Sequence, residues 1–255
     1  MRPVHTPHDR LFHHVFSDRS QAAGELRSML PAELRAELSR RIDWRTLRTV
    51  SGTFVDEALT ERRSDLLFTA RLGDGEILLY LLLEHQSTAD ELMPLRLLRY
   101  MVRIWDEYLQ NHSGVKRLPP IVPLAVHHSQ QGWRAARSFR EIVDLTGNAP
   151  EAIWRHLPHF ELLIDDLSAE RDEALRQRVL LPALARLTLL CLKWASQEDD
   201  VVEGLRRSAE LVREVAHARN GVAALASVVR YLLEVPSKKR ESAHCPRQAS
   251  RWRAS

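Results

Sequence analysis

Residues 62–86 read RRSDLLFTARLGDGEILLYLLLEHQ and contain two strand-like runs, 62–71 and 76–86, separated by Leu72-Gly73-Asp74-Gly75. An Asp-Gly pair between two such runs is typical of a tight β-hairpin. The second run is apolar on both faces from Ile77 to Leu83, as in a strand that is covered on both sides. We therefore expect a hairpin whose second strand is central in a sheet.

The remaining segments have the periodicity of helices and strands. Pro123 favours an edge or irregular position for the strand expected within 121–128. The apolar face of the helix over 92–110 is expected at Leu95, Leu98, Met101, Val102, Trp105 and Leu109. No structure is assigned to 42–60. We expect helices within 8–30, 31–41, 92–110, 173–195 with a kink at Pro182, 199–218 and 221–235, and strands within 121–128 and 160–167. The order predicts a mixed α/β core followed by a C-terminal helical part.

The charge of the chain is unevenly distributed. Residues 236–255 hold six basic residues and one acidic residue, so they carry +5, and residues 1–235 carry −2. The body is therefore not a strongly basic nucleic-acid binder by charge alone. Two cysteines, one in an apolar helical run and one in the polar tail, exclude a disulfide framework and favour a reducing compartment. The longest apolar run is far shorter than a membrane helix needs, and we expect a cytoplasmic protein.

Two acidic residues meet in the predicted hairpin. If Asp74-Gly75 forms a two-residue type I′ turn, Gly73 pairs with Glu76, and Asp65 then lies directly opposite Glu84. In that register Asp65, Glu84 and Gln86 share one face of the sheet. Like charges at about 4 Å repel by about 4 kcal/mol at an effective dielectric constant near 20. A proton, a nearby arginine or a divalent metal would relieve this repulsion.

Two interpretations of this acidic pair remain open. In the first, the carboxylates hold Mg²⁺ or Mn²⁺, which prefer oxygen ligands, and the site hydrolyses phosphodiesters. In the second, Asp65 and Glu84 are solvated strand ends or pair with Arg62 or Arg63. The sequence has no G-x-S-x-G elbow, P-loop or G-x-G-x-x-G motif, which argues against serine hydrolases, nucleoside triphosphatases and Rossmann enzymes.

Four segments together resemble the recombination-promoting nuclease / putative transposase (YhgA-like) family of the PD-(D/E)XK nuclease superfamily. They are HDRLFHHVFSD (8–18), FVDEALTERRSDLLFTARLGDGE (54–76), YLLLEHQSTADELMPLRLLRYMVRIWDEYL (80–109) and LPPIVPLAVHH (118–128). The resemblance covers roughly residues 5–235. It implies a restriction-endonuclease-like core, in which helices flank a central mixed β-sheet, and metal-dependent cleavage of DNA that promotes recombination or is linked to mobile elements.

The resemblance also implies roles for particular residues. Asp65 matches the motif aspartate, and Glu84 matches the glutamate of the E-x-K element. The two carboxylates, with the backbone carbonyl of His85 as a further ligand, would bind Mg²⁺, with Mn²⁺ or Ca²⁺ as alternatives. Asp9 resembles the assisting acid that some members supply from the N-terminal helix. Gln86, which would position the attacking water, stands where the superfamily usually has lysine.

Gln86 motivates a second hypothesis. An amide can hold a water molecule but carries no positive charge. The alternative is therefore a catalytically weak or inactive DNA-binding protein on the same fold, an accessory to recombination.

With the resemblance, the pattern along the chain predicts a nuclease-like domain (1–170), a C-terminal helical region (171–235) and a basic tail (236–255) that is expected to be disordered because it lacks periodic apolar residues. DNA is the expected partner. Apolar density at 179–195 favours a homo-oligomer formed through the C-terminal helices. Arg96, Arg99 and Arg103 form one stripe along the helix expected over 92–110. This stripe either contacts DNA phosphates or is a solvated polar face.

Overall fold

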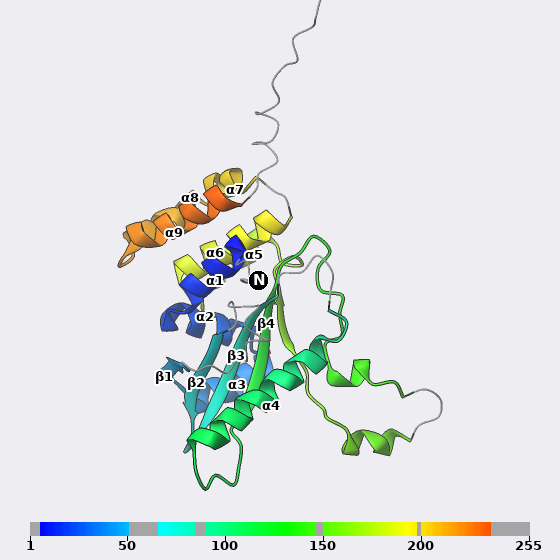
Figure 1. The fold of residues 1–255 in the computed structure, drawn as a ribbon. Helices are drawn as coiled ribbons and strands as arrows, with labels where there is room; N and C mark the ends of the chain where they lie inside the picture. The colour runs from blue at the N-terminus through cyan, green and yellow to red at the C-terminus, as the bar shows by residue number, and fades with distance from the viewer. Residues whose placement is uncertain (1–5, 51–65, 85–89, 146–149, 198–199, 236–255) are drawn as a thin grey trace, which may run out of the picture.

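The computed structural model describes residues 6–50, 66–84, 90–145, 150–197 and 200–235, with the backbone alone for 39 and 80–84. Its centre is a five-stranded sheet with the order β1-β2-β3-β4-β5 (Figure 1). The first three strands are antiparallel, and β3, β4 and β5 are parallel, so the sheet is mixed. The strands are β1 (Ile42–Thr49), β2 (Leu66–Leu72), β3 (Gly75–Glu84), β4 (Ile121–His127) and β5 (Leu163–Asp166).

The predicted hairpin is confirmed, but its turn lies one residue earlier than expected. Leu72 pairs with Gly75, so the two turn residues are Gly73 and Asp74. Gly73 has φ +58, a conformation that glycine adopts without steric cost. The type I′ turn at Asp74-Gly75 is therefore wrong, and so is the pairing of Gly73 with Glu76 that followed from it. Moving the turn by one residue moves the β3 partner of each β2 residue by two positions. Because side chains alternate with a period of two, the same positions of β2 and β3 still share a face.

The helices agree with the predicted segments, with two differences. The helix expected over 199–218 is divided into two helices, and Pro182 precedes the start of a new helix instead of bending one, as its missing N–H permits at a helix start. The helices are α1 (Pro7–Phe16), α2 (Arg19–Met29), α3 (Ala32–Arg41), α4 (Met93–Asn111), α5 (Asp172–Arg176), α6 (Ala183–Ser196), α7 (Val201–Arg207), α8 (Ala209–His217) and α9 (Gly221–Glu234). Two short 3₁₀ helices, Phe139–Ile142 and Glu151–His156, lie between β4 and β5.

Helices cover both faces of the sheet, which makes the fold α/β (Figure 1). Phe68, Leu79 and Val126 belong to a large core shared with α1, α2 and α6. On the other face, Leu67 and Leu78 belong to a smaller core with α4. The alternation of the two cores along β2 and β3 confirms that β3 is a central strand covered on both sides.

The buried face of α4 differs from the predicted one. Its buried residues are Met93, Pro94, Leu97, Tyr100, Met101 and Ile104. Val102 and Leu109, both assigned to the apolar face, are 45% and 43% exposed. The actual stripe lies on the adjacent side of the helix and includes the aromatic ring of Tyr100.

β4 lies inside the sheet, so the edge position suggested by Pro123 is wrong. The pairing of β4 with β5 begins only at Leu124, and Pro123 therefore has no β5 partner in the register. The missing N–H of proline is tolerated where a strand lacks a neighbour.

The C-terminal helices pack on the N-terminal ones. α1 contacts α6 and α9, and α2 contacts α6 and β5. None of the helices within the described ranges is long and apolar enough to span a membrane. Residues 236–255, the predicted tail, lie outside the described residues.

Candidate active site

The predicted metal site falls largely outside the described residues. Asp65, His85 and Gln86 are not among them, and Glu84 is described only as the last backbone position of β3. The predicted pairing of Asp65 with Glu84 depended on the turn that the structure corrects. The shared face of these acids stays a prediction.

Glu84 lies at the carboxyl edge of three parallel strands. In the ladder Glu84 pairs with His127, and His127 pairs with Asp166. These residues thus form one row across β3, β4 and β5. Ligands of open α/β sheets bind outside the carboxyl ends of the strands, so this edge is the position at which we expect a site.

Helix α1 brings its N-terminus to the same edge. His8 lies edge-to-face with His128, which directly follows β4, at 5.1 Å between ring centroids. Asp9 is the next residue, and its carboxylate caps the helix: it accepts hydrogen bonds from Thr6 Oγ1 at 2.8 Å and from the Thr6 backbone N–H at 3.3 Å. This capping box is what the structure shows for Asp9, and its role as an assisting acid stays a prediction.

Two histidines at this edge were not predicted as site residues. His127 and His128 are 2% and 0% exposed. His127 packs edge-to-face on Trp133, and its Nε2 lies 3.0 Å from Ser129 Oγ. Its Nδ1 is buried and has no hydrogen-bond partner among the described residues. The only sequence signal for these residues was a pair of histidines at the end of an apolar strand.

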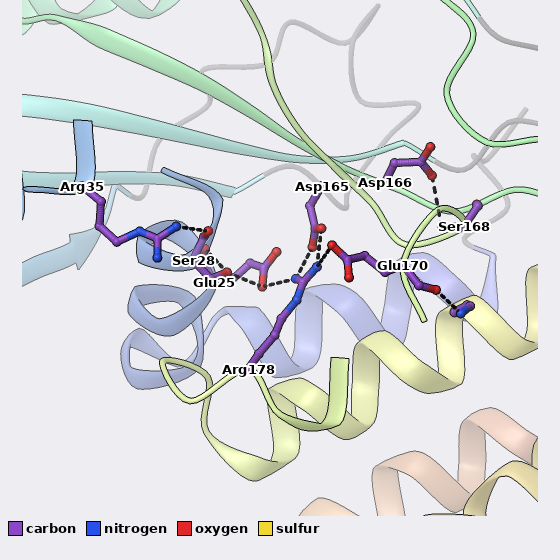
Figure 2. A network of polar contacts seen from close by, with 9 residues as sticks. Glu25, Ser28, Arg35, Asp165, Asp166, Ser168, Glu170 and Arg178 are labelled. Atoms are coloured by element: carbon purple, nitrogen blue, oxygen red, sulfur yellow. Dashed lines mark hydrogen bonds and ion pairs between the residues drawn. The ribbon is translucent and has the colours of Figure 1, made fainter. Parts of the chain in front are cut away.

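The acidic pair in β5 splits between the two faces of the sheet (Figure 2). Asp166 accepts hydrogen bonds from the backbone N–H groups of Trp133, at 2.8 Å, and Ser168, at 3.1 Å. Asp165 accepts two hydrogen bonds from Arg178, at 2.6 and 2.7 Å. Both carboxylates therefore have partners within the protein.

Arg178 also faces a second buried acid. Its Nη1 lies 3.8 Å from Oε2 of Glu25, which is 0% exposed in α2 (Figure 2). Burial, and then the charge of Asp165, raise the pKa of Glu25 well above its ordinary value, although Arg178 opposes the shift. Burial would lower the pKa of Arg178, but the hydrogen bond to Asp165 and the charges of the surrounding acids together outweigh burial and raise the pKa, so the guanidinium stays charged. This cluster joins α2, β5 and the segment before α6, and sequence reasoning missed it.

The predicted donor set suits a hard divalent cation, because it consists only of carboxylate and carbonyl oxygens. Arg178, a cation that would compete for carboxylates at this end of the sheet, is held on Asp165. Within the described ranges, no three His, Cys, Asp or Glu side chains are grouped so as to hold a metal ion.

The three arginines of α4 do not form one free cationic stripe. Arg96 is partly buried and pairs with Asp90 at 2.9 Å. Arg99 and Arg103 are exposed. The structure thus supports a solvated face at these two positions, and a role in DNA binding stays a prediction.

A family model described as "Putative transposase, YhgA-like" matches residues 6–223 of the chain. The chain is also similar to curated proteins from Escherichia coli. It is 37% identical over 125 residues to the recombination-promoting nuclease RpnA of strain K12. The aligned residues cover 48% of this chain and 40% of RpnA. It is 32% identical over 126 residues to the recombination-promoting nuclease RpnD of O157:H7. The aligned residues cover 49% of this chain and 46% of RpnD.

Another relative carries a different name. The inactive recombination-promoting nuclease-like protein RpnE of Escherichia coli K12 is 32% identical over 127 residues, which covers 49% of this chain and 40% of that protein. The chain thus spans less than half the length of these curated relatives. No solved structure matches it.

Proposed function

Because the chain belongs to the YhgA-like putative transposase family, we propose that it is a divalent-metal-dependent DNA endonuclease that promotes recombination or acts with mobile elements. The names of two relatives, both recombination-promoting nucleases, support a DNA substrate. The observation that carries the proposal is the position of Glu84, which ends the central strand in line with His127 and Asp166.

Each proposed site residue has a distinct role on a restriction-endonuclease-like PD-(D/E)XK core. Asp65, Glu84 and the backbone carbonyl of His85 hold Mg²⁺, Mn²⁺ or Ca²⁺. A divalent cation held there would supply a lowered pKa for a bound water molecule and neutralisation of charge on a phosphate oxygen. Gln86 orients the attacking water through its amide. Asp9 assists from the N-terminus of α1, which lies at the same sheet edge through the contact of His8 with His128.

Binding of the substrate is assigned to the exposed side of α4. Arg99 and Arg103, both exposed on α4, are the proposed phosphate contacts, and Arg96 contributes less because Asp90 already neutralises it. The proposed DNA substrate implies a cytoplasmic protein.

A second candidate function has its own support. RpnE is named an inactive nuclease-like protein, and Gln86 lacks the charge of the usual lysine. The alternative is therefore a weak or inactive nuclease that binds DNA as an accessory to recombination.

A plasmid-nicking assay with Mg²⁺, Mn²⁺ and Ca²⁺ tests the proposal. We expect the wild type to nick the plasmid and the Asp65→Asn and Glu84→Gln variants to lose this activity. Asp74→Asn, which changes an exposed carboxylate in the hairpin turn, is the matched control and should cut normally. Nicking that persists in both site variants would overturn the proposed site. Salt-sensitive DNA binding without cleavage in any of the metals would favour the accessory role.

A further inference from the structure

His127 occupies the centre of the row of residues that ends the three parallel strands. The ladders place it between Glu84 of β3 and Asp166 of β5. Residues paired in this way on neighbouring strands direct their side chains to the same face of the sheet. Ala125, two positions earlier, belongs to the core under α4, so the row lies on the α4 face. Trp133, which packs against that core, lies edge-to-face on the ring of His127.

Ser129 determines which ring nitrogen of His127 carries the proton. Its Oγ lies 3.0 Å from Nε2 and accepts hydrogen bonds from the backbone N–H groups of Gly132, at 3.0 Å, and Gln131, at 3.3 Å. A hydroxyl oxygen accepts two hydrogen bonds and donates one. The O–H therefore donates to Nε2, because the other acceptor described near it, the carbonyl oxygen of Gly132, is farther away at 3.4 Å. A ring that accepts at Nε2 carries its proton on Nδ1.

The Nδ1–H group is a buried donor for which the described residues offer no acceptor. His127 is 2% exposed and its Nδ1 is covered, so a molecule from solvent does not reach this atom. A buried N–H without an acceptor costs free energy, and we therefore expect the acceptor within the protein. Asp166 is not the acceptor, because its carboxylate bonds to the backbone N–H groups of Trp133 and of Ser168, the second of which Figure 2 shows. The other neighbour in the row is Glu84.

The loop after β4 indicates the direction of this donor. The two nitrogens of an imidazole point to nearly opposite sides of the ring, and Nε2 of His127 points to the loop at Ser129. This loop is attached to the β5 side of the ring, because the Ser129 backbone N–H donates to Ser168 Oγ at 3.0 Å and the loop's Trp133 N–H donates to Asp166. Nδ1 is therefore on the side of β3.

We propose that His127 is a positioning residue, which donates a hydrogen bond from Nδ1–H to the carboxylate of Glu84. The inference rests on the proposed function, in which Glu84 is a ligand of the divalent cation. A hydrogen bond to one carboxylate oxygen fixes the orientation of the group and leaves the second oxygen for the cation. Carboxylates that bind metals are commonly held by such partners. His127 itself is assigned no contact with the cation or with DNA.

Nitrogen-15 NMR of histidine-labelled protein in metal-free buffer tests the hydrogen bond itself. The signals of His127 are those that disappear in His127→Phe. We expect the wild-type ring in its Nδ1–H form, with signals that shift in Glu84→Ala. Ser129→Ala removes the donor to Nε2 and should populate the Nε2–H form, whereas the control Asp74→Asn should change nothing. A wild-type ring in the Nε2–H form, or Nδ1 signals that do not respond to Glu84→Ala, would overturn the proposal.

Calorimetric titration with Mn²⁺ tests the consequence for the cation. We expect His127→Phe to weaken Mn²⁺ binding at least about tenfold, as loss of a partner of a metal ligand typically does, and to slow plasmid nicking. His127→Asn, whose amide N–H lies near the position of Nδ1–H, should retain most of the affinity. His127→Gln, whose amide extends to the position of Nε2, should not. This pair keeps the test valid if His127→Phe fails to fold.

Ser168→Ala is the matched control for a merely structural effect. The hydroxyl of Ser168 bonds to both the backbone N–H and the carbonyl oxygen of Ser129, so its loss loosens the same loop. This variant should unfold at a lower temperature and bind Mn²⁺ as the wild type does. Full Mn²⁺ affinity in His127→Phe, or an equal loss in Ser168→Ala, would refute positioning by His127 and leave the proposed nuclease intact. If the wild type neither binds Mn²⁺ nor nicks DNA, the proposed nuclease fails, and the NMR result alone decides whether the hydrogen bond exists.

Discussion

The hydroxyl of Tyr231 in α9 lies 2.8 Å from Nδ1 of His8 in α1, although 223 positions separate the two residues. The same hydroxyl donates to the carbonyl oxygen of Cys191 in α6 at 3.4 Å. Burial raises the pKa of Tyr231, so the phenol stays protonated. Because His8 also packs on His128, this bond connects the C-terminal helices to the carboxyl edge of the sheet.

Tyr231→Phe keeps the ring and removes the hydroxyl, and with it the bonds to His8 and to Cys191. We expect the free energy of unfolding to fall by about 1 kcal/mol, the usual net value of a hydrogen bond, and metal-dependent nicking to decrease as α1 loosens. Urea unfolding and the nicking assay measure the two effects. Tyr108→Phe, on the far side of the molecule, is the control for loss of a phenol. An unchanged unfolding free energy would show that the bond contributes nothing.

Arg178 neutralises buried carboxylates, and Arg178→Met should be strongly destabilising. The change leaves Asp165, whose side chain is 8% exposed, with an unpaired charge. Removal of one partner of a buried ion pair costs about 3–5 kcal/mol. Arg206→Met is the control, because Arg206 makes an exposed pair with Glu203 worth at most about 1 kcal/mol. Similar unfolding midpoints for the two variants would contradict the assigned role.

The raised pKa of Glu25 predicts a specific pH dependence of stability. The folded state binds the proton more tightly than the unfolded state, whose carboxyl pKa is near 4.5. The contribution of Glu25 is therefore fully present below that value and is lost as the pH rises through the folded-state pKa.

Glu25→Gln keeps the shape and removes this titration. We expect the stability of the variant relative to the wild type to increase from pH 5 to pH 8 in urea unfolding. Parallel pH profiles for the two proteins would show that Glu25 has an ordinary pKa.

The exposed face of α9 predicts self-association. Val222 and Val229, seven positions apart on the helix, are 82% and 53% exposed. Apolar stripes of this kind commonly mark protein contacts. For the wild type, light scattering should give a molecular mass that rises with protein concentration. For Val229→Asp, it should give the mass of a monomer at every concentration. A wild-type mass of one chain at every concentration would refute the predicted homo-oligomer.

The sequence predicted elements whose apolar pattern is local. The hairpin strands, the helix at 93–111 and the two parallel strands all have such patterns, and each was found. β1 was missed because its burial alternates poorly, with Ile42 and Leu47 as its buried residues. The turn was misplaced because Gly73 and Gly75 flank Asp74 symmetrically, and pairing across the sheet decides between them.

The site was less predictable than the fold, for a physical reason. The cluster of Glu25, Asp165 and Arg178 joins residues far apart in the sequence, and no local spacing indicates it. The same applies to His8 and Tyr231. Long-range packing creates these contacts, whereas the Asp65–Glu84 hypothesis came from two residues within one hairpin.

The contacts of α1 with α6 and α9 also constrain how the polypeptide is made. A ribosome adds about 5–20 residues per second, so the apolar face of α1 waits on the order of ten seconds or more before its partners emerge. Throughout that interval Phe12 and Phe16, both 0% exposed in the finished fold, lack the cover of α6 and α9 and have only the neighbouring α2 to pack against. The nascent chain is therefore a natural client for chaperones that shield apolar segments near the tunnel exit.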